Sequence, residues 1–100
     1  MHFIIIAKDH KDAEALARRN AVREAHLNYV KDAHQRGEQV VAAAMLNDDG
    51  NMCGSVIIVD FPDRSALDVW LEQEAYVTGN VWDINTLEII PCKIPPLFLE

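Results

Sequence analysis

The first hydrophobic segment of the chain has the pattern of a β-strand. HFIIIAKD (2–9) is rich in β-branched and aromatic residues and then becomes charged. Its apolar residues occupy both sets of alternating positions, so both faces of this strand are expected to be covered. The sequence therefore predicts a strand in the middle of a sheet.

The next segment has helical spacing. Strong helix formers run from Lys11 to Arg36, and Gly37 is a typical stop signal. A break between a short first helix and a longer second one is expected at Asn20. In the longer part, the spacing predicts a buried stripe that consists of Val22, Ala25, Tyr29 and Ala33.

Two strands and a turn follow that helix. EQVVAAAML (38–46) predicts a strand, although alanine is a weak strand former and its small side chain leaves room above the sheet. GSVIIVDF (54–61) predicts the next strand. Between them, NDDGN (47–51) is a polar turn that joins a hairpin.

The last third of the chain predicts a second helix and a final strand. Asp63 is a suitable N-cap, and the inner face of the helix is formed by Ala66, Leu67, Trp70 and Leu71. EAYVTGN (74–80) ends this helix irregularly. VWDINTLEIIPCKI (81–94) predicts a strand, which Pro91 restricts to a sheet edge or a bulge.

This order of elements, β-α-β-β-α-β, is the ferredoxin-like arrangement, an α+β fold with an antiparallel sheet in a single domain of residues 1–100. Two helices cover only one face of a four-stranded sheet. The other face also carries apolar residues, which a monomer would expose as a large patch. We therefore expect a homodimer whose two sheets pack face to face.

Composition excludes several classes of function. A net charge of −7 argues against a nucleic-acid partner. No apolar run approaches the ~20 residues that span a bilayer, and the N-terminus lacks signal-peptide features, so we expect a cytoplasmic protein without a membrane partner. Cys53 and Cys92 have no metal-ligand spacing and are interpreted as free thiols. No H-x-E or H-x-x-x-H motif and no cysteine pair indicates a metal site, so no metal is expected. The four glycines are scattered and form no phosphate loop, so no cofactor is expected.

Basic residues nevertheless gather in one part of this acidic chain. They are Lys8, Lys11, Arg18, Arg19 and Arg23. A local positive field of this kind suits a small anionic or phenolic ligand.

The most informative residue is His26, because it lies on the apolar side of its helix, about 40° from Val22. Arg19 and Arg23 share one edge of that side if the helix is continuous. A buried histidine needs a partner that fixes its tautomer. We expect Asp9, at the end of the first strand, to be that partner, and Ser55 to face the same cavity. Such a group is an acid–base arrangement, whereas the alternative is a structural histidine satisfied in the core.

Aromatic residues near the irregular turn are candidates for binding a ring. Tyr76 and Trp82 are expected at the rim of a pocket, where they would stack on a ligand. Trp70 has the helical phase of a core residue.

Several of these segments resemble the YciI-related proteins: FIIIAKD, RRNAVREAHL, GSVIIVDF, the tryptophan of ALDVW, and EAYV. The resemblance covers nearly the whole chain, and its most telling part is Arg23-x-x-His26-Leu27 together with Asp9. It implies a dimeric α+β barrel, similar in fold to muconolactone isomerase. A histidine and an aspartate of the family have suggested enzymatic activity, and one characterised relative removes HCl from a chlorinated hydroxyhydroquinone.

The chain departs from this family at one motif. The family usually has Asp-Pro-Tyr before the last strand, whereas this chain has Glu74-Ala75-Tyr76. If the family's acid is that aspartate, Glu74 takes its role with a longer side chain. If it is the aspartate after the first strand, Asp9 matches unchanged, and this is the alternative that we favour.

The resulting hypothesis is a cofactor-free lyase or isomerase acting on a phenolic or quinone-like ring, most concretely a dehydrochlorinase. His26 would take a hydroxyl proton while Asp9 orients it. Arg19 or Arg23 would hold the oxyanion, and Ser55 a ring hydroxyl. One rival is a non-catalytic small-molecule-binding or interaction module on the same dimeric fold, favoured by the alanine-rich strand. Another is proton transfer on a lactone or similar ring.

Overall fold

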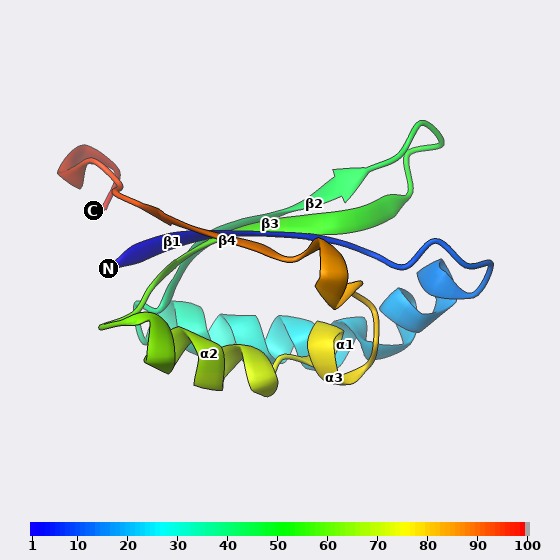
Figure 1. Cartoon of the computed structure of the whole chain (residues 1–100), viewed down its shortest axis with the longest axis horizontal. Coiled ribbons are helices and arrows are strands. Elements are labelled where there is room, and N and C mark those ends of the chain that lie inside the picture. Colours follow the sequence, from blue (N-terminus) through cyan, green and yellow to red (C-terminus); the bar gives the residue numbers. More distant parts are fainter. Residues whose placement is uncertain (100) are drawn as a thin grey trace.

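A four-stranded antiparallel sheet lies over a layer of helices in the computed structural model, which describes residues 1–99 (Figure 1). The strand order is β2-β3-β1-β4. The strands are β1 (His2–Lys8), β2 (Gln39–Leu46), β3 (Met52–Asp60) and β4 (Glu88–Cys92). The helices are α1 (Ala15–Gln35), α2 (Arg64–Glu72) and α3 (Ala75–Thr78). This order of elements confirms the predicted ferredoxin-like α+β fold.

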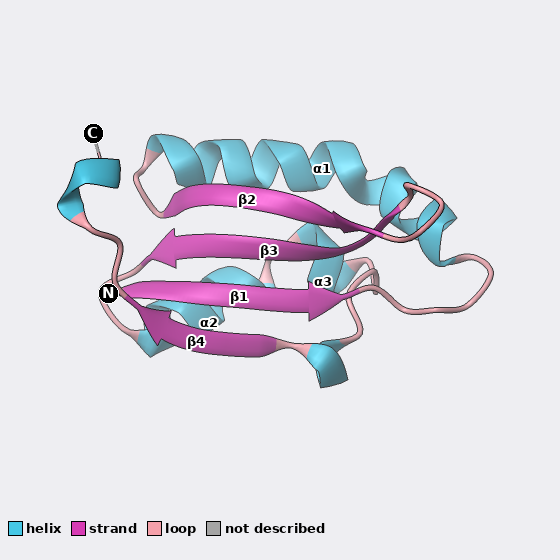
Figure 2. Ribbon diagram, turned by 90° about the horizontal axis from the view of Figure 1, so that it is seen from above, coloured by secondary structure: helices cyan, strands magenta, loops and turns pink. Residues whose placement is uncertain are grey.

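Strand β1 lies between β3 and β4, as its two apolar faces predicted (Figure 2). The alternate residues Phe3, Ile5 and Ala7 are buried against the helices. Ile4 and Ile6 point to the opposite face and are only half-buried, because no element among the described residues 1–99 covers that face.

Helix α1 differs from the prediction in two ways. It begins at Ala15 and continues through Asn20 without a break. The Asn20 side chain is exposed, so water can satisfy its amide in place of the backbone groups of the helix. The buried stripe is also rotated. Ala33 is buried as predicted, but Ala25 is exposed, and two of the buried positions are the polar residues Arg19 and His26.

Helix α2 follows the prediction closely. Asp63 is its N-cap, and the carboxylate accepts a hydrogen bond of 2.9 Å from the Ala66 amide. Leu67, Trp70 and Leu71 are buried against the sheet, which confirms Trp70 as a core residue.

The predicted last strand is wrong in its first half. Only Glu88–Cys92 pairs as β4, and Pro91 lies in this edge strand as expected. Trp82 instead forms an isolated bridge with Asp9, and a short 3₁₀ helix, Ile84–Thr86, follows. The Asp83 carboxylate accepts a hydrogen bond from the Asn85 amide, which turns the chain away from the sheet.

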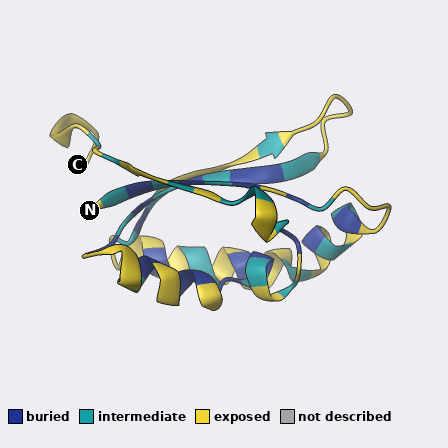
Figure 3. Cartoon of the chain, in the orientation of Figure 1, coloured by how far each residue is buried: buried dark blue, intermediate teal, exposed yellow. Residues whose placement is uncertain are grey.

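The core lies between the sheet and the helices, where the inward-facing residues are buried and the outer surfaces are exposed (Figure 3). The other face of the sheet is apolar but uncovered. The strand registers place on it Ile4, Ile6, Val41, Val56, Ile58 and Ile90. Among residues 1–99, no helix has the length and apolarity needed to cross a bilayer.

Candidate active site

The site is built around His26, which α1 directs toward the short helix α3. His26 Nδ1 lies 2.6 Å from Glu74 Oε1, and both side chains are buried. Glu74 is the N-cap of α3, since the same oxygen accepts a hydrogen bond of 3.3 Å from the Tyr76 amide. A carboxylate on Nδ1 holds the proton there, so Nε2 keeps the lone pair with which a histidine accepts a proton.

Tyr76 occupies the space between two side chains of α1. Its ring stacks on the His26 imidazole with centroids 3.7 Å apart and an interplanar angle of 8°. The Arg19 guanidinium carbon lies 4.6 Å from the centre of the same ring. Positions 19 and 26 are seven residues apart, or about 10.5 Å along a helix axis, so the two groups cover opposite faces of the tyrosine.

Arg19 forms a buried ion pair with Asp9. Its Nη1 donates to both carboxylate oxygens, at 2.8 and 2.9 Å. Its Nη2 donates to the Gly54 carbonyl at 3.2 Å and to Ser55 Oγ at 3.1 Å. Arg19 therefore ties α1 to the end of β1 and to β3, and its charge is matched by that of Asp9.

Ser55 is held in place by two donors. Besides Arg19, the indole Nε1 of Trp82 donates to Ser55 Oγ at 3.1 Å. A serine hydroxyl accepts two hydrogen bonds and donates one. With both acceptor positions taken, the remaining O–H can be donated to a ligand.

These residues surround a cavity of about 180 Å³ between α1, β2, β3 and α3, which we call the inner cavity. Polar groups on its wall come from Arg19, Arg23, His26, Ser55 and Tyr76, and the opposite side is formed by Ala42, Ala43 and Ala44 of β2. The small alanine side chains leave this space open, as their presence in a strand predicted. Arg23 is exposed at the cavity, and within residues 1–99 it has no carboxylate partner, unlike Arg18, Arg19, Arg36 and Arg64.

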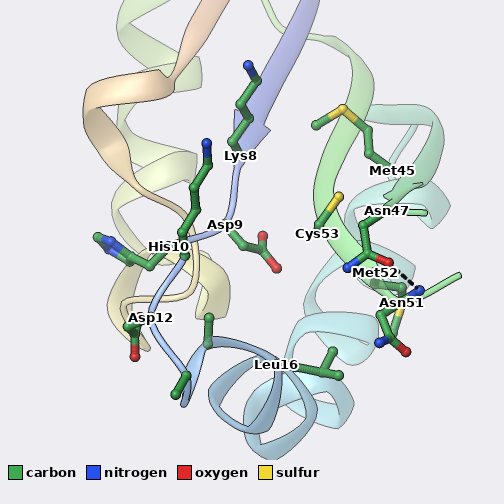
Figure 4. Close-up of a pocket in the computed structure, with 13 residues that line it drawn as sticks. Lys8, Asp9, His10, Asp12, Leu16, Met45, Asn47, Asn51, Met52 and Cys53 are labelled. Atoms are coloured by element: carbon green, nitrogen blue, oxygen red, sulfur yellow. Dashed lines mark hydrogen bonds between the residues drawn. The ribbon is translucent and has the colours of Figure 1, made fainter. Parts of the chain in front are cut away.

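A larger cavity of about 540 Å³, the outer cavity, lies beside the inner one. Asp9 and His10 lie on one side of it, and Met45, Asn47, Met52 and Cys53 line the other (Figure 4). Met52 lines both cavities, and the Asp9–Arg19 pair joins a residue of the outer wall to one of the inner wall. Cys53 and Cys92 are free thiols.

Burial changes the proton affinity of two groups at the site. It raises the pKa of the Asp9 carboxyl, although the hydrogen bond and charge of Arg19 oppose the change. It also raises the pKa of the Tyr76 hydroxyl, against the charges of Arg19 and Arg23. Tyr76 is therefore neutral at physiological pH. Within residues 1–99, no three His, Cys, Asp or Glu side chains are grouped as metal ligands would be.

The structure corrects the expected partner of His26. Asp9 binds Arg19, and Glu74 is the carboxylate on His26. The reason is geometric, because Asp9 follows β1 at the level of the first turns of α1, whereas His26 lies two turns further along. The altered Glu-Ala-Tyr motif was the only signal in the sequence that pointed to Glu74.

Other expected site residues lie near one another, with two changes. Five of them line the inner cavity together: Arg19, Arg23, His26, Ser55 and Tyr76. Trp82 does not line it, and is buried behind Ser55 at 1% exposure rather than at a rim. Tyr76 lines the cavity, but its faces are covered by Arg19 and His26, so it has no face on which a ligand could stack. Leu27, Val30, Met52 and Ile57 complete the lining. Leu27 belongs to the Arg23-x-x-His26-Leu27 motif, whereas no pattern in the sequence marked Val30 or Met52 as site residues.

Comparisons with known proteins agree with this fold. The model of the YCII-related domain matches residues 1–91, so the chain belongs to the YCII-related family. Protein YciI of Escherichia coli O6:H1 is 30% identical over 89 residues, which cover 83% of this chain and 89% of that protein. The xenovulene A biosynthesis cluster protein asL2 of Sarocladium schorii is 31% identical over 85 residues, covering 77% and 73% of the two chains.

Among solved structures, the chain is similar to 5-chloro-2-hydroxyhydroquinone dehydrochlorinase (TftG) from Burkholderia phenoliruptrix AC1100, in complex with 2,5-dihydroxybenzoquinone. The TM-score is 0.80 and the sequence identity 20%, with 97% of this chain and 98% of that chain covered. At this identity, the likeness shows that the two chains share a fold.

Proposed function

We propose that this protein is a cofactor-free lyase that acts on a phenolic or quinone-like ring, most concretely by removing HCl from a chlorinated hydroxyhydroquinone. The observation that carries the proposal is the buried His26–Glu74 pair, with 2.6 Å between Nδ1 and Oε1, whose histidine lies on the wall of the inner cavity. A dehydrochlorinase of the same fold, solved with a dihydroxybenzoquinone, supports the choice of substrate. Membership of the YCII-related family is consistent with it.

In this mechanism, His26 is the general base. Its Nε2 takes a proton from a ring hydroxyl, and the Glu74 carboxylate stabilises the imidazolium that forms. Because Glu74 also caps α3, the carboxylate is fixed before the substrate binds. Little reorganisation is then needed when the charge develops.

Arg23 and Ser55 bind the oxygen atoms of the ring. Arg19 is matched by Asp9, so the unpaired guanidinium of Arg23 is the better partner for the developing oxyanion. Ser55 donates its remaining O–H to a second ring oxygen. Asp9 and Trp82 act indirectly, by holding Arg19 and Ser55 in place.

The size of the inner cavity suits a single ring. An engineered protein cavity of about 150 Å³ binds benzene, and the inner cavity measures about 180 Å³. A six-membered ring with a few oxygen substituents therefore fits between the alanines of β2 and the polar groups of α1.

The test is chloride release and quinone absorbance from a chlorinated hydroxyhydroquinone, with wild type beside His26→Ala. We expect turnover by wild type and a loss on the order of 10²-fold or more in the variant, with an unchanged circular dichroism spectrum. His34→Ala is the matched control, because His34 lies on the same helix but outside the inner cavity. Turnover retained in His26→Ala would remove His26 from the mechanism. Binding without turnover by wild type would favour the non-catalytic binding module instead.

We further propose that the protein is a homodimer in which the apolar open faces of two sheets pack together. The patch formed by Ile4, Ile6, Val41, Val56, Ile58 and Ile90 supports this proposal. A contiguous exposed apolar patch on a sheet is typical of an association surface.

A further inference from the structure

The two faces of the Tyr76 ring are covered, so a ligand in the inner cavity can reach this side chain only at its edge, which carries the hydroxyl. The residue is 1% exposed, and His26 and Arg19 cover the two faces of its ring. The third contact, with the edge of Trp82 at a centroid distance of 5.8 Å, closes one side. The ring is thus held on three sides, with no freedom to rotate away.

The hydroxyl itself has no partner within residues 1–99. The hydrogen bonds of Tyr76 involve its backbone, as in the bond from its amide to Glu74. The fully enclosed side-chain atoms without a partner are Arg19 Nε, Gln39 Oε1, Trp70 Nε1 and Glu74 Oε2, so the Tyr76 hydroxyl keeps an accessible surface. Since Tyr76 lines the inner cavity, we infer that this surface of the hydroxyl faces the cavity.

The charged groups around Tyr76 suit a hydroxyl that donates its proton and then takes up another. Arg19 and Arg23 would stabilise the phenolate, whereas Glu74 and Asp9 would oppose it. The hydroxyl is neutral at rest, because burial outweighs the two guanidinium groups. A neutral phenol beside two positive charges can give up a proton and regain it within one turnover.

We propose that the Tyr76 hydroxyl donates the proton that replaces chlorine on the ring, an inference that rests on the proposed dehydrochlorination. Loss of HCl from a trihydroxylated chlorobenzene to give a hydroxyquinone requires a new C–H bond at the carbon that carries chlorine. A base alone does not supply this proton. His26 removes protons in the proposed mechanism, so a second group must donate one.

The proposed steps balance without any oxidant. His26 Nε2 takes the proton of a ring hydroxyl, the O–H electron pair becomes a C=O bond, and a ring electron pair moves to the chlorine-bearing carbon. That carbon takes the proton of Tyr76 and leaves a phenolate. The phenolate then removes the proton of a second hydroxyl, a second C=O bond forms, and chloride leaves with the C–Cl electron pair. The ring is oxidised to a quinone while the C–Cl bond is reduced to C–H.

The test variant is Tyr76→Phe, which keeps the ring between His26 and Arg19 and removes only the oxygen. We expect kcat for chloride release to fall on the order of 10²-fold or more, with KM within threefold and an unchanged melting temperature. The matched control is Tyr29→Phe, since Tyr29 is the other tyrosine of the chain and its hydroxyl donates to the Trp70 carbonyl, outside the inner cavity. The control should keep its kcat.

A second measurement isolates the proton transfer to carbon. Unchlorinated hydroxyhydroquinone in D₂O should exchange its ring hydrogens faster with wild type than with Tyr76→Phe, as followed by NMR. If wild type releases chloride and Tyr76→Phe matches it in both assays, the role of Tyr76 is overturned and the proposed function stands. If wild type releases no chloride, both proposals fail.

Discussion

At the scale of single residues, the chemistry of this protein depends on which carboxylate meets which cation. Asp9 and Glu74 are both buried, but Asp9 is bound to an arginine and Glu74 to a histidine. The first pair holds α1 in position against β1 and β3. The second can exchange a proton with a ligand, because the His26 imidazole lines the inner cavity.

Glu74→Gln tests the role of that second pair. The amide can still cap α3 and contact His26, but it cannot stabilise an imidazolium, so we expect the kcat for chloride release to fall on the order of 10²-fold. Steady-state chloride release measures the effect. Glu72→Gln is the control, because Glu72 is exposed at the end of α2. A Glu74→Gln variant within threefold of wild type would contradict the role assigned to Glu74.

At the scale of elements, the position of α1 depends on polar contacts as much as on apolar packing. Arg19 and His26 occupy its inner face, where the residue spacing predicted an apolar stripe. Arg19 connects the helix to β1 through Asp9 and to β3 through Gly54 and Ser55. Removing one partner of such a pair leaves an uncompensated buried charge.

Arg19→Met should therefore lower the free energy of unfolding by about 3–5 kcal/mol, as measured by urea denaturation. The double variant Arg19→Met/Asp9→Leu should recover a large part of that loss, because no buried charge is left without a partner. Arg18→Met is the matched control, since the neighbouring Arg18 forms its ion pair with Asp12 at the surface. We expect little change there. If Arg19→Met and Arg18→Met lowered the free energy of unfolding equally, this account of the Arg19–Asp9 pair would be contradicted.

At the scale of the whole molecule, the helices cover one face of the sheet and leave the other without a partner (Figure 1). That open face carries isoleucine and valine side chains on all four strands. Three large apolar residues near the C-terminus, Leu97, Phe98 and Leu99, are also exposed. A second copy of the chain would remove the open face from water, which is the main favourable contribution to association.

Ile58→Lys tests this association, because Ile58 lies in the middle of the open face, opposite Ile4 and Val41. By light scattering, we expect wild type to have twice the 11.3 kDa mass of one chain and the variant to have the mass of one chain. Val69→Lys is the control, since Val69 is exposed on α2, on the other side of the molecule. A monomeric wild type, or an Ile58→Lys variant that is still dimeric, would be inconsistent with the proposal.

The sequence by itself determined the order of the elements and the fold class. Alternation in HFIIIAKD, the helical run before Gly37 and the Asp63 cap are local signals, and local signals specify local structure. The inward direction of His26 was also readable, because helical phase needs no knowledge of other elements. The position of the alanine-rich strand beside a cavity followed from side-chain size.

Only the tertiary structure decided how the site is paired. Asp9 and Glu74 were both candidates for the carboxylate partner of His26. The choice depended on which turn of α1 each carboxylate lies beside in the folded chain. The insertion of Tyr76 between Arg19 and His26 likewise joins residues from two elements that are distant in the chain. Such pairings depend on the angle and register between packed elements, and these are set by the sum of many contacts rather than by any one segment.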